Sequence, residues 1–132
     1  MAMNEFSIKR FLPGIAWFFV VMVLTFLPGE NVPGNSLLER LYFDKWVHAG
    51  IFGLMVILFI RPLVVSSLSQ SLKLRFFLRI AIAAAAWGLA TEFIQKYFIP
   101  GRSFDIWDFV ADSLGCSLAY LFSKHYLLPY KS

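Results

Sequence analysis

Four long apolar runs, separated by turn-forming residues, constrain the fold of this chain more than any other feature. They cover about residues 11–27, 46–65, 76–99 and 103–122. Each run is near the roughly 20 residues with which a helix crosses a hydrocarbon core of about 30 Å. Hydrophobic residues make up 59% of the 132 positions, more than in an ordinary soluble domain. The sequence therefore predicts an all-α integral membrane protein with four spans.

The breaks between the runs are short and carry turn chemistry. They contain Pro28-Gly29, Pro33-Gly34, Pro62, the serine-rich run 66–71 and Pro100-Gly101. The sequence has no linker, internal repeat or low-complexity tract. Because short connections favour antiparallel neighbours, we expect one domain, residues 1–132, folded as an up-and-down four-helix bundle.

Basic residues gather at one side of the predicted bundle. They precede the first span, flank the connection between the second and third spans, and follow the fourth: Lys9, Arg10, Arg61, Lys73, Arg75, Arg79, Lys124 and Lys131. The positive-inside rule then places both termini in the cytoplasm. These basic residues would lie beside anionic lipid head groups, and they account for most of the net charge of +4. The positive charge therefore needs no nucleic-acid partner, and none is expected. The single cysteine, Cys116, excludes an internal disulfide.

The same orientation brings nearly all of the unusual polar residues to the outer ends of the spans. These residues are Asp44, Lys45, His48, Glu92, Gln95, Arg102, Asp105, Asp108 and Asp112. Their spacings of three, four and seven positions within each span place each set on one helix face. A charged group in lipid is costly unless it faces a protein interior. We therefore expect these side chains to form one polar site inside the bundle.

Helix geometry orders this predicted site by depth. With a rise of about 1.5 Å per residue, Asp112 lies on the order of 10 Å deeper than Asp105, and Glu92 reaches a similar level. Stripes of small residues allow the helices to approach closely, and they comprise Ala84, Gly88, Ala111, Gly115 and Ala119. We expect a funnel with a floor of Glu92 and Asp112, a middle layer of His48, Gln95 and Asp108, and a mouth of Asp44, Lys45, Arg102 and Asp105.

The order of these motifs resembles a known family. The motifs are Asp44-Lys45-x-x-His48, Glu92-x-x-Gln95, Pro100-Gly101-Arg102-Ser103-Phe104-Asp105 and Asp108-x-x-x-Asp112-x-x-Gly115. Together they resemble the VanZ-like family of small bacterial membrane proteins. The resemblance implies a single VanZ-like transmembrane domain in the bacterial cytoplasmic (inner) membrane, and an effect on teicoplanin resistance, with which the founding member is associated. At one position the chain departs from the family pattern, because Asp112 stands where Asn is frequent.

The first functional hypothesis is that the funnel binds or modifies a cell-envelope lipid or a lipid-linked cell-wall precursor. Arg102 is suited to bidentate contacts with phosphate or carboxylate, and Lys45 adds a point charge. His48 with Asp108 forms a candidate acid/base pair. The candidate catalytic residues are Glu92, Asp108, Asp112 and His48, and the candidate substrate-binding residues are Arg102, Lys45, Gln95, Asp105 and Asp44.

Two alternatives from other classes stay open. In the first, the basic side chains neutralise the carboxylates and the polar cluster only fixes helix register, as intramembrane polar groups must be paired in any case. In the second, the carboxylates relay protons or cations in a transporter. Whether the protein is an enzyme or a binding protein, and its oligomeric state, are not predicted.

A divalent metal is chemically feasible as a cofactor but is not favoured. The side chains of His48, Glu92, Asp108 and Asp112 offer nitrogen and oxygen ligands. The sequence has no compact ligand motif such as H-E-x-x-H. The sequence thus leaves the metal ligands unassigned.

Overall fold

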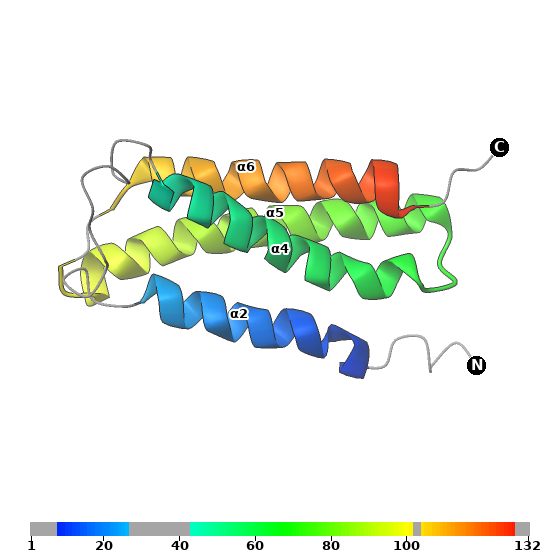
Figure 1. Ribbon diagram of the computed structural model, residues 1–132, viewed down its shortest axis with the longest axis horizontal. Helices are drawn as coiled ribbons and strands as arrows, with labels where there is room; N and C mark the ends of the chain where they lie inside the picture. Colours follow the sequence, from blue (N-terminus) through cyan, green and yellow to red (C-terminus); the bar gives the residue numbers. More distant parts are fainter. Residues whose placement is uncertain (1–7, 27–42, 102–103, 129–132) are drawn as a thin grey trace.

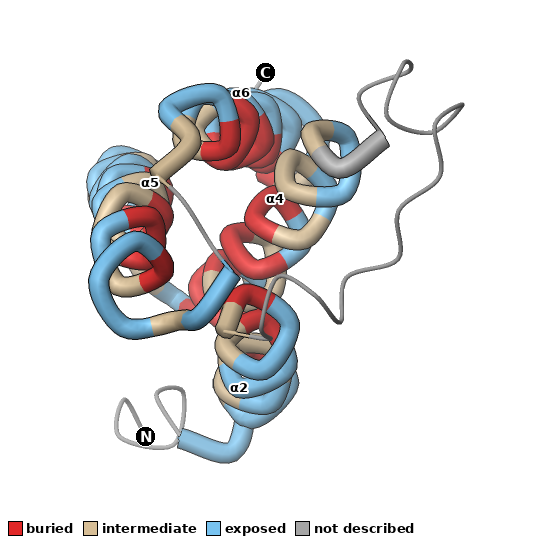
Figure 2. Tube along the Cα trace, turned by 90° about the vertical axis from the view of Figure 1, so that its left-hand side faces the viewer, coloured by how far each residue is buried: buried red, intermediate tan, exposed pale blue. Residues whose placement is uncertain are grey.

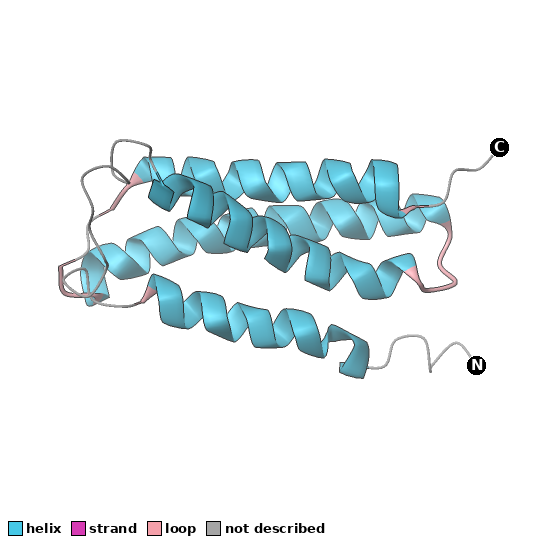
Figure 3. Ribbon diagram, viewed as in Figure 1, coloured by secondary structure: helices cyan, strands magenta, loops and turns pink. Residues whose placement is uncertain are grey.

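The structure is a computed structural model, and it describes residues 8–26, 43–101 and 104–128. The described residues form η1 (Ile8–Phe11), α2 (Leu12–Thr25), α4 (Phe43–Val64), α5 (Gln70–Phe98), α6 (Ile106–Phe122) and the π-helical turn η3 (Ser123–Leu127). These ranges contain no strand (Figure 3). The predicted all-α class is confirmed.

The four long helices lie side by side, and each runs opposite to the one before it (Figure 1). The helix α6 packs against α4 and α5, which also pack against each other, and α2 packs chiefly against α4. The view along the bundle shows α4, α5 and α6 around a common centre, with α2 on the far side from α6 (Figure 2). The described helices thus follow one another up and down the bundle.

Local capping chemistry sets the first residue of two helices. The helix α5 begins at Gln70 rather than near residue 76, because the Ser69 hydroxyl accepts a hydrogen bond from the Leu72 N–H. Lys73 is buried in this added turn and donates to the Val64 carbonyl at 2.9 Å. The helix α6 begins after Asp105, whose carboxylate accepts from the Trp107 N–H at 2.9 Å.

Within the described residues, three helical segments are long and apolar enough to cross a membrane. Judged by length and composition, these are Ile8–Thr25, Lys45–Val64 and Gln70–Phe98. The helix α6 is shorter, at 17 residues, and carries Asp108 and Asp112. Basic side chains of α4 accommodate these two carboxylates: Lys45 contacts Asp108 and His48 contacts Asp112.

Backbone-to-backbone contact holds α4 against α6. A Cβ atom added to Gly115 would lie 2.1 Å from the Ala49 carbonyl oxygen, and one added to Gly53 would lie 3.2 Å from the Gly115 carbonyl oxygen. Gly115, a member of the predicted small-residue stripe on the fourth span, thus lies in the contact between α6 and α4. This close approach brings the start of α4 within side-chain reach of the start of α6.

Candidate functional site

Six polar residues from three helices converge at one end of the bundle. We call them the polar cluster: Lys45 and His48 from α4, Glu92 from α5, Asp105 at the N-cap of α6, and Asp108 and Asp112 from α6. This is the end at which α4 and α6 begin and α5 finishes (Figure 1). The helix periodicity aims each set of side chains at the others, as the sequence spacing predicts.

Lys45 joins the two acidic residues nearest the bundle end. Its Nζ lies 2.7 Å from Asp105 Oδ2 and 2.6 Å from Asp108 Oδ1. Asp105 precedes the first residue of α6 and lies outside the helices. Burial raises the pKa of the Asp105 carboxyl, but the hydrogen bonds from Lys45 and from the Trp107 N–H outweigh burial and leave this pKa below its usual range. Asp105 is therefore a carboxylate at neutral pH.

His48 lies between two carboxylates deeper in the cluster. Its Nδ1 lies 2.9 Å from Asp112 Oδ1, and its Nε2 lies 3.7 Å from Asp108 Oδ2. Asp112 is fully buried, and within the described residues its Oδ2 has no hydrogen-bond partner. If Nδ1 carries the proton toward Asp112, the ring presents Nε2 to the centre of the cluster.

Glu92 is the residue that α5 contributes to the polar cluster. Its side chain is fully buried, and its Oε2 accepts a hydrogen bond from the Asp105 N–H at 3.1 Å. In the described part of the chain, its Oε1 has no hydrogen-bond partner. Glu92, His48 and Asp108 each offer one ligand atom, and these three atoms lie within 4.8 Å of one another.

One predicted member of the middle layer lies elsewhere. The Gln95 side chain is buried and donates its Nε2–H to the Thr25 carbonyl, which ties α5 to the end of α2. Three residues along a helix correspond to a rotation of roughly 60° from the starting direction. This rotation turns Gln95 toward α2 while Glu92 faces α6. The side chain of Asp44, and the whole of Arg102, lie outside the described residues, so their roles stay predictions.

The two predicted floor residues lie at different levels. A Cβ atom added to Gly88 would lie 2.9 Å from Asp112 Oδ2, so Asp112 faces a position one turn before Glu92 on α5. The Glu92 carboxylate instead accepts a hydrogen bond from the backbone N–H of Asp105. The sequence-based estimate took Pro100 and Asp105 as level, whereas α5 extends further than the start of α6 (Figure 1). Asp112 is therefore the deepest carboxylate of the polar cluster.

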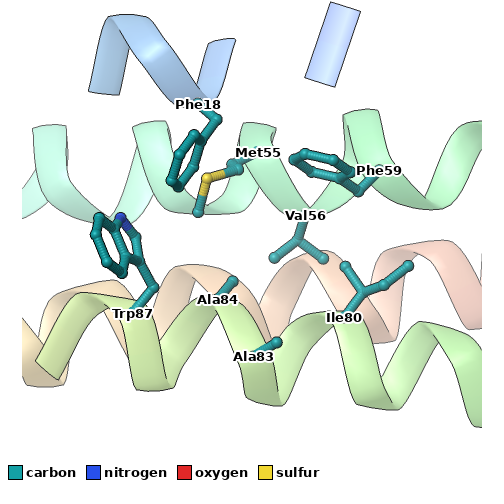
Figure 4. Close-up of a pocket in the computed structure, with 8 residues that line it drawn as sticks. All are labelled: Phe18, Met55, Val56, Phe59, Ile80, Ala83, Ala84 and Trp87. Atoms are coloured by element: carbon teal, nitrogen blue, oxygen red, sulfur yellow. The ribbon is translucent and has the colours of Figure 1, made fainter. Parts of the chain in front are cut away.

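A separate apolar cavity of about 250 Å³ lies between α2, α4 and α5. Its lining comprises Phe18, Met55, Val56, Phe59, Ile80, Ala83, Ala84 and Trp87 (Figure 4). The sequence analysis did not predict this cavity, because it forms where side chains of three helices fail to meet. It carries no carboxylate, imidazole or thiol, which distinguishes it from the polar cluster.

The sequence analysis also missed a backbone group in the polar cluster. The Asp105 N–H is bonded to Glu92, and no side-chain pattern signals such a contact, since every residue except proline has this donor. The signal that was available is an aspartate, Asp105, near the start of a predicted helix, which is typical of an acidic N-cap. The N–H of an N-cap residue has no partner within its own helix.

Comparison with known proteins found a protein of similar sequence. The chain is 34% identical over 126 residues to "Uncharacterized protein C11E3.10" of the fission yeast Schizosaccharomyces pombe, and the match covers 92% of this chain and 68% of the yeast protein. No family model matches the chain. No solved structure matches it.

Proposed function

This chain belongs to the same family as protein C11E3.10 of fission yeast, and we propose that it is a multi-pass membrane protein whose polar cluster binds the head group of a lipid or lipid-linked precursor. In this proposal α6 is the fourth span beside the three apolar segments. His48, Glu92 and Asp108 contact the ligand, and Asp112 orients His48. Lys45 and Asp105 hold the starts of α4 and α6 together.

The outer surface of the bundle supports placement in a membrane. Large apolar side chains on the described helices point outward, and Val23, Ile82 and Leu118 are each more than half exposed. Apolar surface of this extent is unfavourable in water but not in lipid. The three candidate spanning segments carry the same indication.

The distribution of charge supports an orientation. The basic residues Lys9, Arg61 and Lys73 lie at the end of the bundle opposite the polar cluster, where α2 begins and α4 meets α5 (Figure 1). By the positive-inside rule this end is cytoplasmic. Both termini are then cytoplasmic, and the polar cluster opens toward the other face of the membrane.

A single observation carries the proposal of a binding site. Among the described residues, Glu92 Oε1 and Asp112 Oδ2 are buried acceptors without a hydrogen-bond partner. A network that only fixed helix register would satisfy its buried acceptors, because each unsatisfied one costs about 1–3 kcal/mol. Unpaired acceptors in a cluster near a membrane surface are suited to a ligand that brings donors or a cation.

His48 gives this site the means to transfer a proton. The contact between His48 Nδ1 and Asp112 Oδ1 fixes the orientation of the ring, which leaves Nε2 to exchange a proton with the ligand. Asp108, which faces Nε2 at 3.7 Å, is the group with which His48 shares the ligand. Binding with subsequent proton transfer to or from a head-group oxygen therefore fits the arrangement.

The two alternatives account for less of the structure. The register hypothesis explains the ion pairs of Lys45 with Asp105 and Asp108, and we assign that role to those contacts alone. A transporter needs a polar path beyond the cluster, but the described core there is apolar, with Val56, Ile60 and Phe77 fully buried. We therefore place head-group binding ahead of both.

The comparison also bears on which lipid is bound. The relative is a fission-yeast protein, so a head group common to bacterial and fungal membranes suits the family better than a target restricted to bacterial cell walls. The VanZ-like resemblance, the bacterial inner membrane and the effect on teicoplanin susceptibility stay predictions of the motif pattern. All three are compatible with a phospholipid or polyprenyl-phosphate ligand.

Lipid that co-purifies with the protein tests the proposal. The wild type, Glu92→Gln and His48→Gln are extracted from the same membrane preparation in a mild detergent, and bound lipids are identified by native mass spectrometry. We expect one lipid class to be enriched several-fold over its bulk share in the wild type. Both variants should lose this enrichment, because each substitution changes a group that faces the ligand.

The matched control is His125→Gln. His125 is exposed and lies in η3, beyond the end of α6, so this variant should retain the enrichment. An equal lipid profile in all four proteins, with unchanged helix content, would contradict head-group binding and favour the register hypothesis.

A further inference from the structure

We infer that His48, Glu92 and Asp108 form the protein side of a divalent-cation site, with Asp112 as the carboxylate that orients His48. The three ligand atoms, one from each residue, lie within 4.8 Å of one another. Ligands of one tetrahedral ion at about 2.0–2.2 Å lie about 3.3–3.6 Å from one another. The side chains must therefore close by about 1–1.5 Å around an ion.

An independent observation points to a ligand at this position. The fully buried Glu92 carboxylate has one oxygen bonded to the Asp105 N–H and the other without a partner in the described ranges. A buried carboxylate oxygen in this state is strongly unfavourable. A cation beside it supplies the missing partner without any movement of α5.

The contacts of His48 match those of a metal ligand. Histidines that bind metals through one ring nitrogen usually donate the other N–H to a carboxylate, which fixes the tautomer and raises the basicity of the ring. Here Nδ1 faces Asp112 at 2.9 Å, and Nε2 is the nitrogen on the side of Asp108. Asp112 is therefore a positioning residue rather than a ligand.

The charge of the cluster also favours a cation. Among the residues that the structure describes, the cluster has the carboxyl groups of Glu92, Asp105, Asp108 and Asp112 and, opposite them, the ammonium of Lys45 and the imidazole of His48. Among these described residues, four carboxyl groups thus face two basic groups, one of which is an imidazole. A divalent cation reduces the excess of negative charge at the depth where it is most costly.

The donor set indicates the class of ion. One imidazole nitrogen and two carboxylate oxygens suit a first-row transition ion such as Zn²⁺ or Mn²⁺, whereas Mg²⁺ prefers an all-oxygen shell. Three protein ligands leave at least one coordination position open. This role of the ion rests on the proposed function: the open position accepts a phosphate oxygen of the lipid head group. An acid-rich site does not bind an anionic phosphate by itself.

Metal binding without added lipid tests the inference. The full chain, purified in detergent with a tag that lacks histidine, is stripped with EDTA and dialysed against Zn²⁺ or Mn²⁺. Bound metal is then counted by elemental mass spectrometry. We expect one ion per wild-type chain. Glu92→Gln and His48→Gln should each weaken binding at least tenfold, and Asp112→Asn by about tenfold or more through His48.

The exposed His125 provides the control. His125→Gln removes a histidine without touching the cluster, so it should bind metal as the wild type does, and bound metal should raise the Tm of both proteins. Less than one ion per wild-type chain, or equal metal affinity in His48→Gln and His125→Gln, would overturn the site. If His48→Gln does not fold, the metal affinity of the near-isosteric Glu92→Gln is compared with that of His125→Gln instead. Lipid enrichment without metal refutes only this inference. One ion per chain without lipid enrichment supports the metal site and refutes the proposed lipid ligand.

Discussion

At the scale of single residues, Asp105 combines two roles. Its Oδ1 accepts the Trp107 N–H at the start of α6, and its Oδ2 accepts from Lys45. The first contact is a helix cap and the second an ion pair with a partly exposed partner. The cap satisfies the Trp107 N–H, a backbone donor that has no carbonyl partner within the helix. An ion pair between partly exposed side chains contributes little, so the cap contributes more to stability than the ion pair does.

Substitutions at Asp105 separate these two contributions. We expect Asp105→Asn, which keeps a capping oxygen, to lower the free energy of unfolding by less than about 1 kcal/mol. Asp105→Ala should cost about 1 kcal/mol more, because it removes the cap as well. Thermal unfolding in detergent, followed by circular dichroism, measures the difference. Equal losses in the two variants would mean that the ion pair, and not the cap, stabilises the start of α6.

At the scale of elements, the α4–α6 contact depends on a missing side chain. Gly115 lies so close to Ala49 that an added Cβ would be 2.8 Å from its carbonyl carbon as well. A backbone carbonyl within a helix cannot move without moving the helix. The position therefore sets the distance between α4 and α6, and with it the distance between Lys45 or His48 and the carboxylates.

Gly115→Ala should consequently push α4 away from α6. We expect a loss of about 1–3 kcal/mol in the free energy of unfolding, the usual cost of overpacking, and weakened metal and lipid binding. Gly50→Ala is the matched control, because nothing lies within 4 Å of its added Cβ. That variant should be neutral or more stable by up to about 1 kcal/mol, since alanine favours the helix. A Gly115→Ala protein as stable as Gly50→Ala would contradict the close contact.

At the scale of the whole molecule, the bundle has a polar end and a basic end. The polar cluster lies where α4 and α6 begin, and the basic residues lie where α2 begins and α4 meets α5. The apolar core between them includes the fully buried Phe52, Val56 and Phe77. Such polarity favours a fixed orientation in a membrane.

Reporter fusions measure this orientation. We expect a reporter joined after residue 132 to report from the cytoplasm, because the four proposed spans return the chain to the side from which it started. A cysteine placed at exposed Pro100 should react with an impermeant thiol reagent added from the opposite side, whereas buried Cys116 should not. Labelling of Pro100→Cys only after permeabilisation would reverse the orientation.

The sequence by itself determined the properties that depend on local physics. Apolar runs of membrane-crossing length specify long helices, and the serine-rich run 66–71 and Pro100-Gly101 specify where two of them break. Pro62 was also predicted to lie in a break, but it lies inside the last turn of α4. The helical period places Glu92 and the aspartates of α6 on definite faces, so the gathering of Lys45, His48, Glu92, Asp105, Asp108 and Asp112 at one end of the bundle could be predicted. The helices and their faces need only the neighbours of a residue along the chain, and the gathering at one end adds the up-and-down order that short connections favour.

Only the tertiary structure decided how the helices are rotated and shifted against one another. It turns Gln95 to Thr25 of α2, sets Asp112 against Gly88, seats Gly115 on Ala49 and bonds Glu92 to the backbone of Asp105. Axial shift and rotation follow from the fit of side chains across helices and from the path of the connections. These are contacts between residues far apart in sequence, so no periodicity within one helix could have specified them.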